Sequence, residues 1–307
     1  MRRVMFARPV KGPGRSDEEG AILILVVFLT VTLVAMAALV VDVGALLDEH
    51  RQLQNGADAG ALAVAHSCGL GACDVGLAQA LANANSRDGD SLAAVTLPPV
   101  NRVKVISSTR GGGGALLPFA FGQVLTGEKG KTLRATAIAG WGPPSSASAI
   151  PLAISQCDLE QLGIGNYSVI TFAKAGGPCV AKDSSGAFGW LTAPCPTTFS
   201  VGATVAGDPG SSGPVPCLVI NTDVLLPVFD TVTGTGNNTR YHVVGFAALH
   251  VTGWRFQGSN ASTPNPCGNS TCIAGTFLNQ ILNDTTGAAA GVGTGTGFGV
   301  SRIFLVS

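Results

Sequence analysis

The sequence predicts an α+β protein. A long N-terminal transmembrane helix extends outside the membrane and is followed by a β-rich, disulfide-bonded extracytoplasmic region. Three observations predict this class. An uncharged apolar run occupies residues 21–41, close to the N-terminus. The sequence after it continues with helical spacing and without proline to about residue 65. The remainder contains short segments of alternating apolar and polar residues, together with all eight cysteines.

The apolar run has the length of a membrane span. Its 21 residues would extend about 32 Å as a helix, against a hydrocarbon core of roughly 30 Å. A cleaved secretory signal is the alternative, because Ala35-Met36-Ala37 resembles a small-residue cleavage site. Signal peptides have apolar regions of only about 7 to 15 residues, so we favour an anchor. The predicted anchor residues are Ala21, Leu25, Phe28, Leu33 and Val41.

The flanks of the run predict its orientation. Residues 1–20 form a basic leader with five lysines or arginines against three acidic residues. The first polar residues beyond the run are Asp42, Asp48 and Glu49. Lys and Arg stay on the cytoplasmic side of single-pass proteins. We therefore expect a cell-membrane protein with a cytoplasmic N-terminus and an extracytoplasmic C-terminal region.

The helix that continues outside the membrane has an unusually small packing face. Gly56 and Gly60 are spaced as in the small-xxx-small pattern, which lets another helix or backbone approach closely. Each glycine costs a helix about 1 kcal/mol relative to alanine, so this surface is expected to be packed. It could pack on its own domain or on another protein, and the sequence leaves both open. The predicted packing positions are Gly44, Leu53, Gly56, Gly60 and Val64.

The N-terminal segment resembles a known family. Glu19-Gly20-Ala21 precedes the run, residues 41–44 (VDVG) end it, and residues 51–55 (RQLQN) and 57–63 (ADAGALA) follow. Together these strings are similar to the start of the TadE/TadG-like proteins of Tad (Flp, tight-adherence) pilus assembly systems. The resemblance covers about 50 residues and implies a membrane protein that works with a pilus apparatus. Its partners would be the membrane and other pilus-assembly or pilin-like membrane proteins.

Two departures from related proteins matter. Pilin-like members are cut after a glycine and carry a glutamate at position five of the mature chain, whereas the fifth residue after Gly20 is Leu25. Gly14 has Glu19 in that place, but the residues between them are polar. We favour an uncleaved anchor, with a processed subunit as the alternative. Residues 183–186 (DSSG) do not fit the metal motif of a von Willebrand A domain, so no such metal site is expected.

The rest of the chain is expected to form two outer units. Alternating residues at 100–109 and 131–141 predict strands, so residues 42–141 would form a pilin-like helix plus a small β unit. We interpret the apolar segment at 116–125 as core, with a helix at the bilayer interface as the alternative. A Pro/Ser-rich linker is predicted at 142–151. Residues 152–307 would then form a β-rich disulfide-containing domain, with strands at 216–221, 224–232 and 241–254 and a closing strand at the C-terminus.

The cysteines are disulfide candidates because an extracytoplasmic compartment is oxidising. Eight cysteines allow 105 pairings, and two pairs have the spacing C-x4-C, which favours two local loops. A zinc site that uses those pairs with His66 is the alternative. The candidates are Cys68, Cys73, Cys157, Cys179, Cys195, Cys217, Cys267 and Cys272.

The sequence offers little chemistry. It contains no GxSxG, P-loop, HExxH or CxxC motif, and its net charge is zero. We therefore expect no enzyme, no cofactor, no metal, no nucleic-acid partner and no identified small-molecule substrate. His242 and His250 lie about 27 Å apart along one extended strand, so they are expected to be exposed or hydrogen-bonded, not to share a metal.

Two functions compete. The first is a structural or assembly component of a Tad/Flp-type pilus system. The second is a surface-exposed binding module or adhesin with an incidental anchor, which would hold its ligand near Trp190, Trp254 and residues 265–270. An exported hydrolase is a third and weaker hypothesis.

Overall fold

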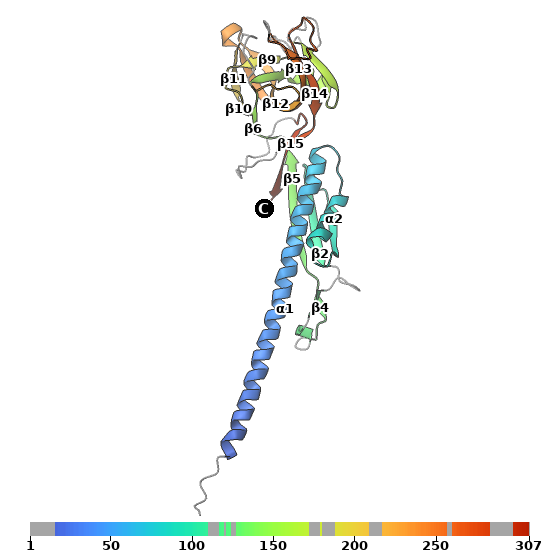
Figure 1. Cartoon of the computed structure of the whole chain (residues 1–307), viewed down its shortest axis with the longest axis vertical. Helices are drawn as coiled ribbons and strands as arrows, with labels where there is room; N and C mark the ends of the chain where they lie inside the picture. Colours follow the sequence, from blue (N-terminus) through green and yellow to red (C-terminus); the bar gives the residue numbers. More distant parts are fainter. Residues whose placement is uncertain are drawn as a thin grey trace, which may run out of the picture.

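The computed structural model describes residues 16–109, 117–119, 121–123, 127–171, 179, 188–208, 217–256, 260–282 and 297–306. A long helix, α1 (Ser16–Gly69), runs from the N-terminal end of the chain to the first of two β-rich units. The first unit packs beside the second half of α1, and the other lies beyond its C-terminal end (Figure 1). The predicted α+β class is confirmed.

The first unit, which we call the shoulder, combines two helices with one sheet. The sheet has the order β1-β2-β5-β16-β15, and α1 and α2 pack against it. The pairs β1–β2, β2–β5 and β5–β16 are antiparallel, whereas β15 and β16 are parallel. Its elements are α2 (Gly76–Asn85), β1 (Ser91–Thr96), β2 (Arg102–Thr109), β5 (Arg134–Gly142), β15 (Gln280–Leu282) and β16 (Val300–Val306).

The core of the shoulder consists mainly of alanine and valine. Ala57, Ala61 and Val64 of α1 are buried in one cluster with Val103 and Val105 of β2 and with Ala137 and Ala139 of the neighbouring strand β5. Small side chains on both surfaces let the helix lie close to the sheet. The strands predicted at 100–109 and 131–141 are confirmed as β2 and β5.

The second unit, which we call the head, contains a seven-stranded sheet in the order β11-β9-β7-β12-β13-β14-β8. An additional β11–β13 pairing joins β11, β9, β7, β12 and β13 into a closed ring of strands. A second sheet pairs β6 (Ser146–Ala149) with β10 (Thr197–Ser200). The other elements are β7 (Leu152–Ser155), α4 (Gln156–Leu162), β8 (Tyr167–Thr171), β9 (Phe188–Leu191), β11 (Thr204–Asp208), β12 (Thr222–Thr233), η1 (Gly236–Asn238), β13 (Arg240–Arg255) and β14 (Cys272–Leu278).

The longest strands of the head form the predicted hairpin. β12 and β13 pair antiparallel across the turn at 234–239, which confirms the hairpin predicted from 224–232 and 241–254. Alternate apolar residues of this hairpin enter the core, including Leu226, Val228 and Leu249. The strand predicted at 216–221 is wrong. Residues 217–221 lie in no strand, Asn221 has a φ of 59°, and extended structure begins at Thr222; residue 216 lies outside the described residues.

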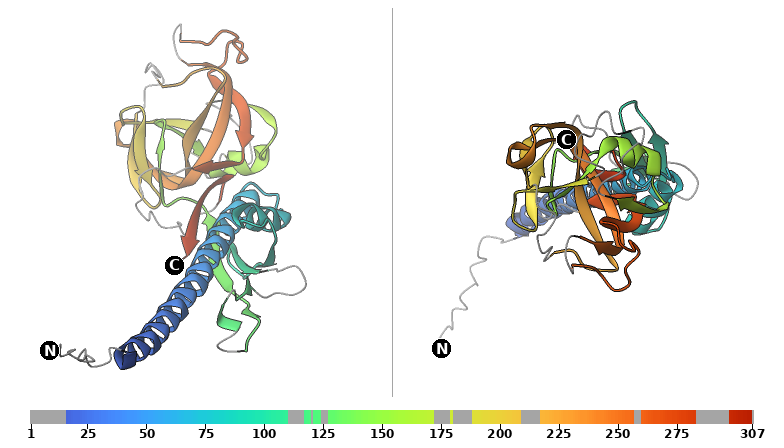
Figure 2. Two further views of the ribbon diagram at one scale, coloured as in Figure 1. Left: turned by 60° about the horizontal axis from the view of Figure 1, so that its bottom comes forward. Right: turned by 90° about the horizontal axis from the view of Figure 1, so that it is seen from above.

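The end of the chain returns to the shoulder. A strand was expected there as a closing strand of the C-terminal domain, but β16 pairs with β5 instead, with Phe304 opposite Gly140. β15 follows β14 directly and also joins this sheet. In Figure 2 (left) the red C-terminal strand runs from the head back beside α1. The range predicted as a linker, 142–151, contains β6, which pairs within the head.

The apolar segment at 116–125 is only partly described. A short antiparallel pair, β3 (Leu117–Pro118) with β4 (Gly130–Lys131), extends from the shoulder along α1 (Figure 1). Leu116 lies outside the described residues, whereas Phe121 is 48% exposed. The prediction that this segment is core is therefore wrong for Phe121, because the segment projects from the sheet and does not lie under it.

Candidate functional site: the bare and packed halves of the long helix

Between residues 22 and 41, α1 is apolar on every face and uncovered. Leu25 is 65% exposed, Phe28 71% and Leu33 57%, although they point in different directions around the helix. Val41, at the end of the run, is 52% exposed. Ala21 lies in the helix, but its side chain is outside the described residues. A helix that is hydrophobic all round needs an apolar environment, and here no protein supplies one.

Two threonines within this half keep their hydroxyls bonded to the helix itself. Thr30 donates to the carbonyl oxygens of Val26 and Val27, each at 2.9 Å. Thr32 donates to the carbonyl oxygen of Phe28 at 2.8 Å. Hydroxyls satisfied in this way are compatible with hydrocarbon, where an unpaired polar group is costly. Among the described residues, one helix, Ile22–Gly69, is long and apolar enough to cross a membrane.

The second half of α1 is buried along one stripe. Its buried positions follow each other at intervals of three and four residues, as on one face of a helix. Gly56 and Gly60 lie in this stripe because α2 crosses there at close range. A Cβ atom on Gly56 would meet Ala82 Cα at 3.1 Å, and one on Gly60 would meet Ala78 Cα at 3.1 Å. The stripe consists of Leu53, Gly56, Ala57, Gly60, Ala61, Val64, Ala65 and Cys68.

The predicted packing positions therefore fall into two groups. Leu53, Gly56, Gly60 and Val64 all contact the shoulder or lie buried under it. Gly44 is different, because a Cβ atom on it would meet nothing within 4 Å. The sequence left open whether this face packs on the protein's own domain or on another protein. Between residues 53 and 68 the structure places it on the protein's own domain.

A polar cluster joins the two halves. The Arg87 guanidinium lies 3.0 Å from the Asp48 carboxylate, and the Arg87 backbone N–H donates to Gln52 Oε1 at 2.6 Å. Burial raises the pKa of Glu49, and the nearby carboxylates of Asp88 and Asp48 raise it further, against the lowering effect of Arg87. These contacts hold the loop after α2 against α1.

Asp42 is the residue that sequence reasoning missed. Its side chain is 8% exposed, and its carboxylate accepts hydrogen bonds from the backbone N–H groups of Phe121, at 3.1 Å, and Gly122. From the sequence, Asp42 is only a charge that marks the end of the run. A signal was present, since an acidic residue directly after 21 uncharged residues is an isolated charge that needs donors.

Comparison with known protein families gives a match for the N-terminal part of the chain. Residues 20–67 match the Tad family, described as Flp pilus-assembly TadE/G-like. This range, which we call the Tad segment, confirms the resemblance predicted for the N-terminal part of the chain. No curated protein matches the chain, and no solved structure does. The Tad segment contains both the bare half of α1 and most of the buried stripe, so the matched feature is the helix that joins the apolar run to the shoulder.

All eight cysteines are paired. The two C-x4-C pairs form the local disulfides Cys68–Cys73 and Cys267–Cys272, as their spacing favoured. The other two bonds are Cys157–Cys179 and Cys195–Cys217, both in the head. No cysteine is free, so no thiolate remains for the zinc alternative, and its two pairs lie in different units.

The two histidines of β13 each face an aspartate of β12. His242 Nδ1 lies 2.8 Å from Asp230 Oδ1, and His250 Nδ1 lies 2.6 Å from Asp223 Oδ1. Each pair is a cross-strand contact at the surface of the hairpin, with side chains between 37% and 45% exposed. The contacts stabilise the pairing of the two strands.

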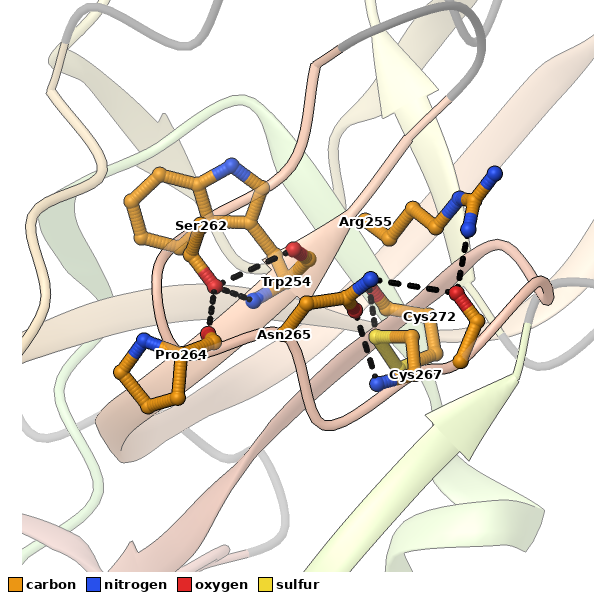
Figure 3. Close-up of a disulfide and its surroundings, with 8 residues drawn as sticks. Trp254, Arg255, Ser262, Pro264, Asn265, Cys267 and Cys272 are labelled. Atoms are coloured by element: carbon orange, nitrogen blue, oxygen red, sulfur yellow. Dashed lines mark hydrogen bonds between the residues drawn. A yellow bond between two sulfur atoms is a disulfide. The ribbon is translucent and has the colours of Figure 1, made fainter.

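The loop suggested for an adhesin site is bonded to itself. Around Cys267–Cys272, Asn265 accepts from the Cys267 N–H at 2.9 Å and donates to the Gly268 carbonyl at 3.1 Å, as Figure 3 shows. Arg255 donates to Asn269 Oδ1 at 3.0 Å. Trp190 is 7% exposed and meets Phe256 edge to face with ring centroids 5.0 Å apart, so it belongs to the core. The hydrogen bonds fix the conformation of the loop, and Trp190 packs in the core beneath the head sheet's surface.

Proposed function

We propose that the protein is a single-pass, membrane-anchored envelope protein that acts as a structural or assembly component of a Tad/Flp-type pilus system. The observation that carries this proposal is the match of residues 20–67 to the Flp pilus-assembly family, on a helix whose apolar half is bare. The shoulder and head are the parts that this anchor would present at the membrane surface.

The proposed orientation puts the N-terminus in the cytoplasm and both β-rich units outside. The basic leader before the run supports it, since Lys and Arg remain on the cytoplasmic side. The four disulfides also support it, because bonds of this kind persist in oxidising compartments.

The proposed role is structural and not enzymatic. Apart from the disulfides, the polar contacts in the described head are hydrogen bonds that hold loops and strands together, as in the Asn265 loop and the two His–Asp pairs. The partners would be the membrane and other membrane proteins of the pilus system. Exposed positions of α1 just outside the run, such as Val43 and Leu47, are available to them.

Deletion and complementation in a host that assembles Flp pili tests the proposal. Removal of the gene should abolish or strongly reduce pili counted by electron microscopy, and the full chain should restore them. A Leu29→Arg/Leu33→Arg variant tests the anchor separately, because both positions lie near the middle of the run, where an arginine costs about 3 kcal/mol on insertion. The shoulder and head are unchanged in this variant. It should not restore pili. Normal pili in the deletion strain would refute the proposal, and normal pili with lost surface attachment would favour the adhesin alternative.

A further inference from the structure

The loop that carries Phe121 is fixed at the point where the apolar half of α1 ends. Asp42 follows the last apolar residue of the run, and its carboxylate accepts the Phe121 N–H at 3.1 Å together with the Gly122 N–H. Charge-assisted bonds of this kind are roughly twice as strong as neutral ones. Gly122 permits the approach, since a Cβ atom there would lie 3.0 Å from Asp42 Oδ2.

The loop also lies on the membrane side of the shoulder. The C-terminal end of α1 contacts Trp141, near the end of β5, because a Cβ atom on Gly69 would be 3.7 Å from the Trp141 side chain. The strand therefore begins, at Arg134, nearer to the apolar run. The β3–β4 pair precedes β5 in the chain and lies beside the middle of α1 (Figure 1).

The exposed side chains of this loop have the chemistry of a membrane interface. Phe121 is 48% exposed, and Lys129 and Lys131 are both exposed. Glu128, beside Lys129, is exposed too, so the two lysines leave the described part of the loop with a net positive charge. The Phe119 N–H donates to the Lys129 carbonyl at 3.2 Å, so the aromatic and the basic parts of the loop lie side by side. Aromatic rings partition to the boundary between headgroups and acyl chains, and lysines beside them interact with lipid phosphates.

We propose that the described parts of this loop, residues 117–119, 121–123 and 127–131, form a second membrane contact. In this contact Phe121 enters the bilayer interface, and Lys129 and Lys131 bind phospholipid headgroups. We assign lipid, and not protein, to this surface because the loop lies beside the end of the membrane span. There Val40 is 69% and Val41 52% exposed. Asp42 is a positioning residue for this contact. Two attachments, the span and the loop, would fix the tilt of the shoulder over the membrane.

Tryptophan quenching in proteoliposomes tests the contact with the full chain. Single variants Phe121→Trp, Val100→Trp and Phe28→Trp are reconstituted into vesicles that contain lipids brominated near the headgroup or near the chain end, and the quenching of the parent protein is subtracted. Val100 is the matched exposed control, because it is 83% exposed and lies in the turn between β1 and β2 at the opposite end of the sheet. Phe28 reports whether the span itself is in the bilayer.

We expect lipids brominated near the headgroup to quench the fluorescence of Phe121→Trp at least about twofold more than that of Val100→Trp. The reason is that an interfacial ring lies about 5 to 10 Å into the boundary between headgroups and acyl chains. Adding Asp42→Ala to Phe121→Trp should remove the difference while Phe28→Trp stays quenched by deep bromines. Equal quenching at 121 and 100, with Phe28→Trp quenched, overturns the lipid contact alone and leaves the anchor of the proposed function intact. No quenching of Phe28→Trp overturns both. If Phe121→Trp is shielded from the brominated lipids only at a high ratio of protein to lipid, a second copy of the protein covers this residue. That result would also overturn the lipid contact.

Discussion

Replacement of Gly60 by leucine tests whether the small face of α1 serves the protein's own fold. A Cβ atom at this position would lie 3.1 Å from Ala78 Cα and 3.4 Å from both Ala78 Cβ and the Ala78 carbonyl oxygen. Ordinary carbon contacts are about 3.5 to 4.0 Å. The neighbour is the backbone of α2, so it cannot move aside as a flexible side chain would.

The magnitude follows from two opposing effects. Overpacking against a backbone costs about 3 kcal/mol, at the upper end of the usual range. Leucine recovers about 0.8 kcal/mol because it favours helix over glycine. The net loss is about 2 kcal/mol for the docking of α2 on α1, which corresponds to roughly a thirtyfold increase in local opening.

Gly44→Leu is the matched control, since it makes the same change in the same helix where nothing lies within 4 Å. It should keep the gain in helix propensity and leave α2 unaffected. Hydrogen exchange of the α2 amides in the full-length, detergent-solubilised protein measures the difference. Unchanged α2 exchange in Gly60→Leu, combined with reduced co-purification of other membrane proteins, would refute the reasoning and make this face intermolecular.

Three further predictions concern charge, disulfides and close backbone contact. Glu49 has a raised pKa in the folded protein, so ionisation of its carboxyl destabilises the fold as the pH rises from the unfolded pKa to the folded one. Glu49→Gln should therefore raise the unfolding temperature at pH 7 and lose this advantage below about pH 4. An advantage that does not change with pH would contradict this. A Cys157→Ser/Cys179→Ser variant, which opens a bond with sequence separation 22, should lower the free energy of unfolding of the head by about 3 kcal/mol in denaturant titrations; a midpoint that does not shift would count against it. Gly275→Ala should destabilise the head by about 3 kcal/mol, because its Cβ would overlap the His250 carbonyl oxygen, and thermal unfolding equal to that of the parent would exclude the overlap.

The parts of the fold that depend on local pattern could be predicted from the sequence. The apolar run, the continuing helix and strands β2, β5, β12 and β13 follow from periodicity, which reports which side of an element is buried. Gly44 shows the limit of the same argument. It belongs to a glycine-rich helix but lies about 2.5 turns before Leu53, where the buried stripe begins, and a Cβ atom on it would meet nothing within 4 Å.

Features that depend on contacts between distant residues could not be predicted. β16 pairs with β5 although about 160 residues separate Phe304 and Gly140, and no local pattern selects a partner across such a distance. The pairs Cys157–Cys179 and Cys195–Cys217 could not be predicted for the same reason. The hydrogen bond between Asp42 and the Phe121 loop joins residues separated by 79 positions. The sequence indicates that Asp42 needs donors, but it does not indicate that this apolar segment supplies them.

The most direct test of the central claim, a membrane-anchored protein with an oxidised exterior, is the intact mass of the protein extracted from the membrane fraction. The mass is measured after alkylation, with and without prior reduction. We expect the full chain, about 30.8 kDa, with eight alkyl groups added only after reduction. A mass that lacks residues through about Ala37, or eight alkyl groups without reduction, would contradict the account, because the first would remove the span and the second would place the cysteines in a reducing compartment.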